Sequence, residues 1–339
     1  MKHRKVAGMT ALVPPEVIYA SGWSARDVNN GIPCSDCRPR SKLCAWTAGW
    51  REEIFAGNLR LDALVVVAGG DCHNALADGQ NAARKVDRAH FLFYPFDGDV
   101  DYMRGQLDRL TKFLTKGSSP PKGQKKLMSQ IEELKGMGRD VERARSEGRI
   151  DPALAFRTLI SFSDFEGDVA RFRDKVINVL DKRESGGRQE DDMKGLDRKP
   201  RVALIGVPPI YRDFHAVCAE AGLHAVFDEL PHEFVRLGGS DIEELAKSYS
   251  TYTFARPVDY RLEALKKDLD RHDIDGIIHY TQFTCHHLLE DGMLREKLKW
   301  PMLTLQGDLP GETPAQIRMR LEAFAEMLGG NRPKKKVNG

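Results

Sequence analysis

The sequence feature that most limits the fold is an apolar run at residues 61–68 that stops at two glycines, Gly69 and Gly70. Such a run is typical of a strand that is buried on both faces. A second apolar run follows at 90–95, and the 74–88 segment between the two has helical composition and no proline. A strand, a helix and a strand in this order form a β-α-β unit, which predicts a parallel sheet.

The same alternation returns in the last third of the chain. Short apolar runs there predict four strands, and the amphipathic stretches between them predict helices. The predicted strands are 201–207, 224–227, 274–280 and 302–305, and the predicted helices are 214–221, 260–271 and 313–328.

The middle of the chain repeats apolar residues at helical spacing, as at Leu107, Leu110 and Leu114, and a charged stretch at 181–199 predicts an exposed linker. We therefore predict an α/β fold with two doubly wound, Rossmann- or flavodoxin-like parallel-sheet lobes joined by a helical segment. In such sheets, ligands bind beyond the carboxyl ends of the strands. The predicted divisions are an N-terminal α/β lobe at 1–98, the helical segment and linker at 99–198, a C-terminal α/β lobe at 199–330 and a basic tail at 331–339.

Composition excludes several classes of protein. The 339 residues carry 52 Lys and Arg against 50 Asp and Glu, a net charge of +2 that gives no reason to expect nucleic acid as a partner. The longest apolar run, 64–70, is far shorter than the ~20 residues that span a bilayer, so we expect no membrane segment and a cytoplasmic location. Six cysteines are too few for a disulfide scaffold in a chain of this length, and as grouped thiols they indicate metal or redox chemistry.

The positions of three cysteines are informative. Cys72 and Cys285 each follow a predicted central strand, one in each lobe, so two facing lobes could bring them together. Cys44 begins a predicted helix at 45–56, where the helix dipole and free N–H groups are expected to lower the thiol pKa and favour the thiolate. Three thiolates between two lobes suit an iron–sulfur cluster, because soft sulfur ligands select iron–sulfur or zinc over hard cations.

Other interpretations of the cysteines stay open. Cys72 and Cys285 could be small buried hydrophobic residues, as we predict for Cys218 on the apolar side of the helix at 214–221. Cys34 and Cys37 form a Cys-x-x-Cys pair, which permits a zinc knuckle, a redox pair or extra cluster ligands. Structural zinc normally takes four ligands, which these two cysteines, Cys44 and a histidine could supply.

Several motifs occur in order along nearly the whole chain. Residues 13–22 read Val-Pro-Pro-Glu-Val-Ile-Tyr-Ala-Ser-Gly, and Cys44 is followed 28 residues later by Cys72. The C-terminal part reads Asp-Gly-Ile-Ile, Gln-Phe-Thr-Cys, Trp-Pro-Met-Leu-Thr-Leu-Gln-Gly-Asp and a final Glu-Ala-Phe. This pattern resembles the 2-hydroxyacyl-CoA dehydratase and benzoyl-CoA reductase family, and in particular subunits like the 2-hydroxyglutaryl-CoA dehydratase D-component.

The resemblance implies a [4Fe–4S] cluster held by Cys44, Cys72 and Cys285 between the lobes. It also implies a homologous second subunit, in a heterodimer or homodimer, and an ATP-hydrolysing iron–sulfur activator that supplies single electrons. The substrate would be a CoA thioester, whose ketyl radical anion permits either dehydration or reduction of an aromatic ring. Such a lyase or oxidoreductase is oxygen-sensitive and belongs to anaerobic metabolism.

The chain departs from the family pattern beside the cysteines. His73 follows Cys72, and His286 and His287 follow Cys285, where the family more often has Asp. A sister group with a double-cubane cluster has a cysteine where this chain has Thr10, so the resemblance favours one cubane over two. Cys34 and Cys37 have no clear counterpart in the family.

Four further side chains are candidates for a chemical role. Glu16 could carry protons near the cluster, or it could only complement a helix dipole. His73, His286 and His287 could donate to a substrate carbonyl, shuttle protons or tune the cluster, and one or two of them could instead face solvent.

Three functional hypotheses follow from these residues. The first is the iron–sulfur subunit of an ATP-activated dehydratase or reductase that acts on a CoA thioester. The second is a double-cubane-like or electron-transfer iron–sulfur reductase of small molecules, in which Cys34 and Cys37 complete the ligation. The third is a zinc-stabilised binding module.

Overall fold

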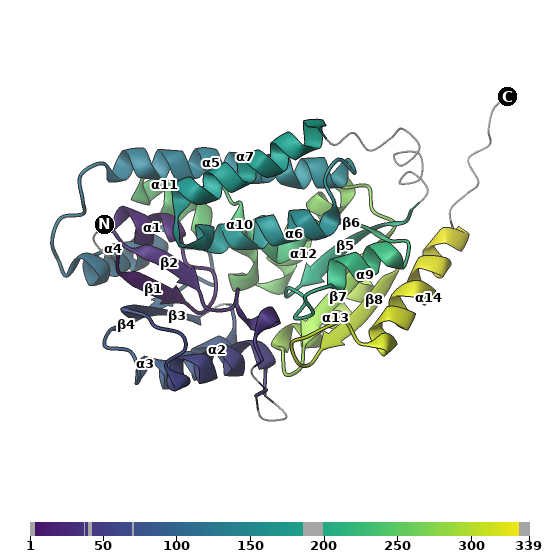
Figure 1. Ribbon diagram of the computed structural model, residues 1–339, viewed down its shortest axis with the longest axis horizontal. Coiled ribbons are helices and arrows are strands. Elements are labelled where there is room, and N and C mark those ends of the chain that lie inside the picture. Colours follow the sequence, from purple (N-terminus) through teal and green to yellow (C-terminus); the bar gives the residue numbers. More distant parts are fainter. Residues whose placement is uncertain (1–3, 37, 40–42, 70, 186–198, 332–339) are drawn as a thin grey trace.

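Two four-stranded sheets, each entirely parallel, form the framework of the computed structural model (Figure 1). The structure describes residues 4–36, 38–39, 43–69, 71–185 and 199–331. The first sheet has the order β2-β1-β3-β4 and the second has the order β6-β5-β7-β8. Their strands are β1 (Val6–Met9), β2 (Ser24–Asp27), β3 (Ala63–Gly69), β4 (Ala89–Phe93), β5 (Arg201–Gly206), β6 (His224–Asp228), β7 (Gly276–Gln282) and β8 (Met302–Gly307). This arrangement confirms the predicted α/β class with two doubly wound lobes.

Helices connect the parallel strands. In the first lobe they are α1 (Pro15–Ala20), α2 (Ala45–Ala56), α3 (His73–Ala83) and α4 (Val100–Thr115). In the sequence between the first sheet and the second, the described residues form α5 (Gln124–Ser146), α6 (Pro152–Ile160) and α7 (Val169–Ser185). The second part holds α9 (Phe214–Glu220), α10 (Glu229–Phe234), α11 (Ile242–Tyr249), α12 (Val258–Arg271), α13 (Asp291–Lys297) and α14 (Ala315–Asn331). Short 3₁₀ turns are η1 (Ile32–Cys34), η2 (Ser161–Ser163), η3 (Phe165–Gly167), η4 (Thr253–Ala255) and η5 (His286–Glu290).

The predicted linker and tail fall largely outside the described residues. Positions 186–198 and 332–339 lie there, and the first residues of the predicted linker, 181–185, continue α7.

The central strands occupy the positions that their apolar sequences predict. β3 is buried along nearly its whole length, and it pairs with β1 on one side and β4 on the other. β7 is buried throughout and pairs with β5 and β8. Because every strand in a sheet runs in the same direction, the carboxyl ends of β1 and β3 lie at one edge, as do those of β5 and β7.

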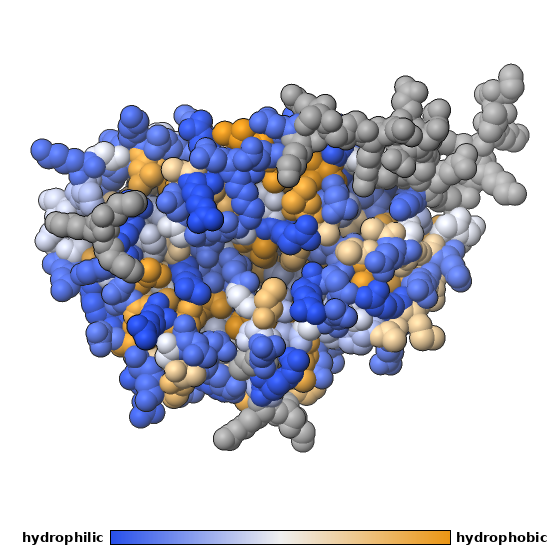
Figure 2. Space-filling view, viewed as in Figure 1, coloured by the Kyte–Doolittle hydropathy of each residue, from blue (hydrophilic) through white to orange (hydrophobic). Residues whose placement is uncertain are grey.

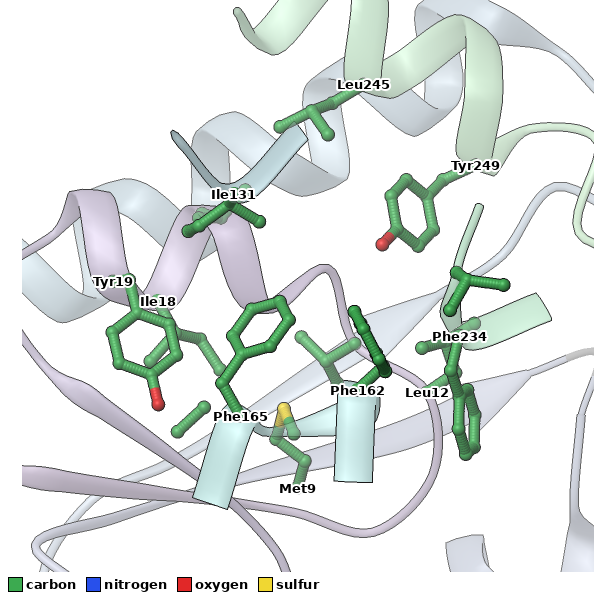
Figure 3. Packing of buried hydrophobic residues seen from close by; sticks show 14 of the residues in the cluster. Met9, Leu12, Ile18, Tyr19, Ile131, Phe162, Phe165, Phe234, Leu245 and Tyr249 are labelled. Atoms are coloured by element: carbon green, nitrogen blue, oxygen red, sulfur yellow. The ribbon is translucent and has the colours of Figure 1, made fainter. Parts of the chain in front are cut away.

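The two lobes share a core. After β6, the chain returns to the first lobe, where α11 packs against α4. Leu245 and Tyr249 of α11 belong to the same buried cluster as Met9 and Ile18 of the first lobe (Figure 3). The long helix α5 contacts both α1 and β6, and it lies alongside α7 (Figure 1). These contacts fix how the two sheets face each other.

Candidate metal centre

A cavity of about 390 Å³ lies between the carboxyl ends of the two sheets. Thr10 follows β1 and Cys72 follows β3 on its first-lobe side. Val207 follows β5 and Cys285 follows β7 on the opposite side, and Phe156 of α6 contributes from the helical segment. The cavity therefore occupies the place where doubly wound sheets bind ligands.

Three of the cysteines that line this cavity stand at the starts of helices. Cys44 is the N-cap of α2, Cys72 is the N-cap of α3 and Cys285 is the N-cap of η5. The Sγ atom of Cys72 accepts a hydrogen bond from the Ala75 N–H at 3.4 Å. Helix amino ends present free N–H groups and a partial positive charge, so they favour a negatively charged occupant.

The turns that carry Cys72 and Cys285 touch across the lobe boundary. Asn74 donates from Nδ2 to the Thr284 carbonyl at 3.2 Å. The rings of His73 and His286 meet edge to face with centroids 5.2 Å apart. Thr284 has a φ of 65°, a left-handed conformation that costs a non-glycine residue about 1–2 kcal/mol. These contacts hold the turn of Cys72 and the turn of Cys285 together.

The electrostatics of the three thiols show that they influence one another. Burial raises the pKa of Cys72, and the charges of Asp71, Cys44 and Cys285 raise it further. Burial raises the pKa of Cys285 to about 11, with a contribution from Cys44.

The expected lowering of the Cys44 pKa is wrong in its net direction. The amides of Trp46 and Thr47 do lower it, but the side chain is only 8% exposed and burial outweighs them. A bound metal would supply the positive charge that three buried or half-buried thiolates need.

Cys44, Cys72 and Cys285 offer soft sulfur donors, which iron–sulfur clusters and zinc both take. A single zinc ion draws its sulfur ligands to within ~2.3 Å of one point, whereas a cluster spreads them over several irons. Among the residues that the structure describes, no group of three His, Cys, Asp or Glu side chains is arranged to hold a metal ion. The zinc set of Cys34, Cys37 and Cys44 stays a prediction, because Cys37 lies outside the described residues.

Glu16 lies away from this cavity. It is 1% exposed and pairs with Lys135, which is fully buried. Tyr249 donates to its carboxylate at 3.1 Å. The catalytic role suggested for Glu16 stays a prediction, and the structure places the residue in the core between α1 and α5.

The three histidines occupy different environments at the edge of the site. His73 is exposed and His286 is half-buried. Burial, together with the neighbouring His287 and His73, lowers the pKa of His286 to about 4, so its ring is neutral at pH 7.

His287 belongs to a buried hydrogen-bond network. It contacts Glu290 at 3.0 Å and Arg261 at 3.3 Å. Arg261 also donates twice to Glu229, at 2.6 and 2.7 Å, and Glu229 accepts the Gly206 N–H at 2.8 Å. The network ties η5 to the end of β5, so His287 positions the turn that carries Cys285.

A polar pair inside the cavity, Tyr252 and Asp71, was not predicted from the sequence. Tyr252 donates to Asp71 at 3.2 Å, and both residues line the cavity beside Cys72. Burial raises the pKa of Asp71 to about 6. The position of Asp71 directly before Cys72 was a usable local signal, whereas Tyr252 is 181 residues away and carried none.

The chain matches a family of known proteins over nearly its whole length. Residues 10–328 match the family model described as 2-hydroxyglutaryl-CoA dehydratase, D-component. The chain therefore belongs to that family of dehydratase subunits, which confirms the resemblance inferred from its motifs. The protein "Putative dehydratase subunit YjiM" of Escherichia coli (strain K12) is 23% identical over 179 residues. That match covers 48% of this chain and 47% of the relative, about half the length of each.

None of the helices in the described ranges is long and apolar enough to cross a membrane. On the face shown in Figure 2, hydrophilic side chains predominate and apolar ones form small separate groups.

Proposed function

We propose that this chain is the iron–sulfur subunit of an enzyme of the 2-hydroxyacyl-CoA dehydratase or benzoyl-CoA reductase type. Cys44, Cys72 and Cys285 would hold a [4Fe–4S] cluster in the cavity between the lobes. The observation that carries this proposal is the arrangement of three cysteines at helix N-cap positions, drawn from both lobes, around one cavity. The membership in a family of dehydratase subunits supports it.

The bound cluster would supply one-electron reduction of the thioester carbonyl, chemistry that protein side chains cannot perform alone. The residues of this chain hold and shield the substrate. Leu12, Phe156 and Phe234 form apolar parts of the wall and help to exclude water. Tyr252 and Asp71 place a proton, on the tyrosine Oη, next to the cluster ligand Cys72.

Cationic side chains suit the phosphates of coenzyme A. Arg157, Lys175 and Arg212 line the cavity and are exposed or half-exposed, so they lie on its solvent side. Lys175 and Arg212 also pair with the exposed carboxylates of Glu166 and Glu312. Arginine and lysine at such a position can bind phosphate through charge-assisted hydrogen bonds.

Two protein partners follow from the proposed chemistry. An ATP-hydrolysing iron–sulfur activator would deliver the electron, and a homologous second subunit would complete the enzyme. We also propose a cytoplasmic location, because a reducing compartment keeps the ligand cysteines as thiols.

Binding of a thioester to the cluster-loaded protein tests the proposal. Under anaerobic conditions, 2-hydroxyglutaryl-CoA should change the electron paramagnetic resonance (EPR) spectrum of the reduced cluster, whereas free coenzyme A should not. Arg157→Ala should weaken thioester binding roughly tenfold through loss of a phosphate contact. Arg171→Ala is the matched control, because this exposed arginine of α7 is not among the cavity-lining residues. An unchanged spectrum with 2-hydroxyglutaryl-CoA and with benzoyl-CoA, each at saturating concentration, would contradict the proposal.

A further inference from the structure

The cavity contains a fourth cysteine. Of the five cysteines in the described part of the chain, Cys34, Cys44, Cys72 and Cys285 all line it. Cys218 is different, because it lies fully buried on α9 in the apolar core. The thiols of this chain are therefore concentrated at the proposed cluster site.

Cys34 is held differently from the other three. Cys44, Cys72 and Cys285 occupy N-cap positions of helices and are buried or half-buried. Cys34 is the last residue of the 3₁₀ turn η1, and it is exposed. Its thiol is therefore more accessible to solvent than the thiols of the other three cysteines.

The turn is nevertheless anchored to the helix that Cys44 begins. Ile32 of η1 is 2% exposed and packs against Gly49 of α2, where an added Cβ would lie 3.2 Å from the Ile32 side chain. Ser35 donates to Glu53 of the same helix at 3.5 Å. Ile32 and Ser35, which flank Cys34 in the sequence, both contact α2. These contacts keep Cys34 close to the cavity.

We propose that Cys34 is a fourth, exchangeable ligand of the cluster that Cys44, Cys72 and Cys285 hold. This inference rests on the proposed function. Four-iron clusters have four ligand positions, so three cysteines leave one iron without a protein ligand. A tethered thiol has an effective concentration in the millimolar range at such a position.

The ligation requires no oxidant or reductant. The Cys34 thiol gives its proton to solvent and binds as the thiolate, and the charge of the iron favours that loss. A thioester that enters the cavity from the same side would displace the thiolate, which takes up a proton again. In the absence of substrate, Cys34 therefore closes the open iron and protects it.

The rate at which the cluster loses one iron shows whether Cys34 occupies the fourth ligand position. A cluster with an open iron releases it on mild oxidation by ferricyanide and leaves a three-iron cluster with a distinct EPR signal. The full-length protein would be purified anaerobically as wild type, as Cys34→Ala and, to control for loss of one thiol, as Cys218→Ala. Iron and sulfide per chain would be measured first, and the rate of three-iron cluster formation second.

We expect all three proteins to carry the same iron and sulfide. Cys34→Ala should form the three-iron cluster roughly tenfold faster than the wild type, because it lacks the tethered ligand. It should also bind added cyanide, with a changed EPR spectrum, at a lower concentration than the wild type and Cys218→Ala, because in those two proteins cyanide must first displace the Cys34 thiolate.

Three outcomes would overturn the inference, and they are distinguishable. Equal rates and equal cyanide binding in the wild type and Cys34→Ala would show that Cys34 is not a ligand. Loss of all iron in Cys34→Ala alone would make Cys34 an obligatory ligand rather than an exchangeable one. Absence of iron and sulfide from every protein would overturn the proposed function itself, and this inference with it.

Discussion

Glu16 and Lys135 form an ion pair in the core, and Tyr249 contacts both of them, at 3.1 Å from the carboxylate and 2.9 Å from the lysine Nζ. Both charges are almost completely removed from water. Removing one partner of such a pair is costly because the other charge stays buried without compensation. The contacts with Lys135 and Tyr249 therefore give the Glu16 carboxylate a structural role in the core.

We predict that Glu16→Gln lowers the free energy of unfolding by roughly 3–5 kcal/mol, because Lys135 loses its counter-charge. Adding Lys135→Met should recover most of this loss. Denaturant unfolding of the two single variants and the double variant measures the coupling. A Glu16→Gln protein with normal stability and reduced turnover would instead support the proton-carrying role.

The sequence predicts the position of a residue well when the neighbouring residues in the chain determine that position. Cys72 and Cys285 were correctly placed at the ends of central strands, because an apolar run directly precedes each one. The pairing of Asp71 with Tyr252 was missed, because nothing near either residue indicates the other. The net rise in the pKa of Cys44 was also missed, because the burial that causes it depends on the packing of distant elements.

At the scale of elements, length and burial decided which strands could be predicted. β3 and β7 have seven residues each and are almost entirely buried, so their sequences are distinctive. β1 and β2 have only four residues each, and β2 reads Ser-Ala-Arg-Asp with alternating burial. Such a short polar strand forms because the neighbouring β1 provides its hydrogen bonds, which no local pattern reveals.

Helix α3 packs so closely on β3 that a glycine is needed at the contact. A Cβ added at Gly79 would lie 2.5 Å from Val66 Cγ1, and the branched valine side chain is buried in the core. Gly136 of α5 is the opposite case, because its Cβ would have no neighbour within 4 Å.

We predict that Gly79→Ala destabilises the protein by about 1–3 kcal/mol through overpacking. Gly136→Ala should stabilise it by up to about 1 kcal/mol, because alanine favours the helical conformation. Thermal or urea unfolding of both variants measures the difference. Equal effects of the two substitutions would show that α3 can move away from the sheet freely, and with it Cys72.

At the scale of the whole molecule, the helical segment is joined to the first lobe by a buried carboxyl group. Asp164 accepts hydrogen bonds from the Asp27 N–H and the Glu166 N–H, both at 2.9 Å. Burial, and then the charge of Asp27, raises the pKa of Asp164 to about 7 from an ordinary value of 3.8. The folded protein thus keeps a proton on Asp164 at a pH where the unfolded chain has lost it.

Because the folded state binds more protons than the unfolded state between these pKa values, stability must fall as the pH rises from about 4 to 7. We predict that the wild type loses about 2–3 kcal/mol more than Asp164→Asn between pH 5 and pH 8. Urea unfolding of both proteins at the two pH values measures this. Parallel pH profiles would mean that Asp164 ionises normally in the folded protein.

The overall architecture brings cysteines of both lobes to one cavity. Cys44 and Cys72 belong to the first lobe and Cys285 to the second, and the shared core of α11, α4 and α5 holds the two lobes face to face. A single inorganic group could therefore join both lobes.

Iron and sulfide analysis after anaerobic reconstitution measures whether Cys44, Cys72 and Cys285 hold one cluster between the lobes. We predict about four irons per chain in the wild type and in Cys218→Ala. We also predict loss of most of that iron in each of Cys44→Ala, Cys72→Ala and Cys285→Ala. A wild type that holds zinc in place of iron, or a Cys285→Ala protein that keeps its full complement of iron, would contradict this prediction.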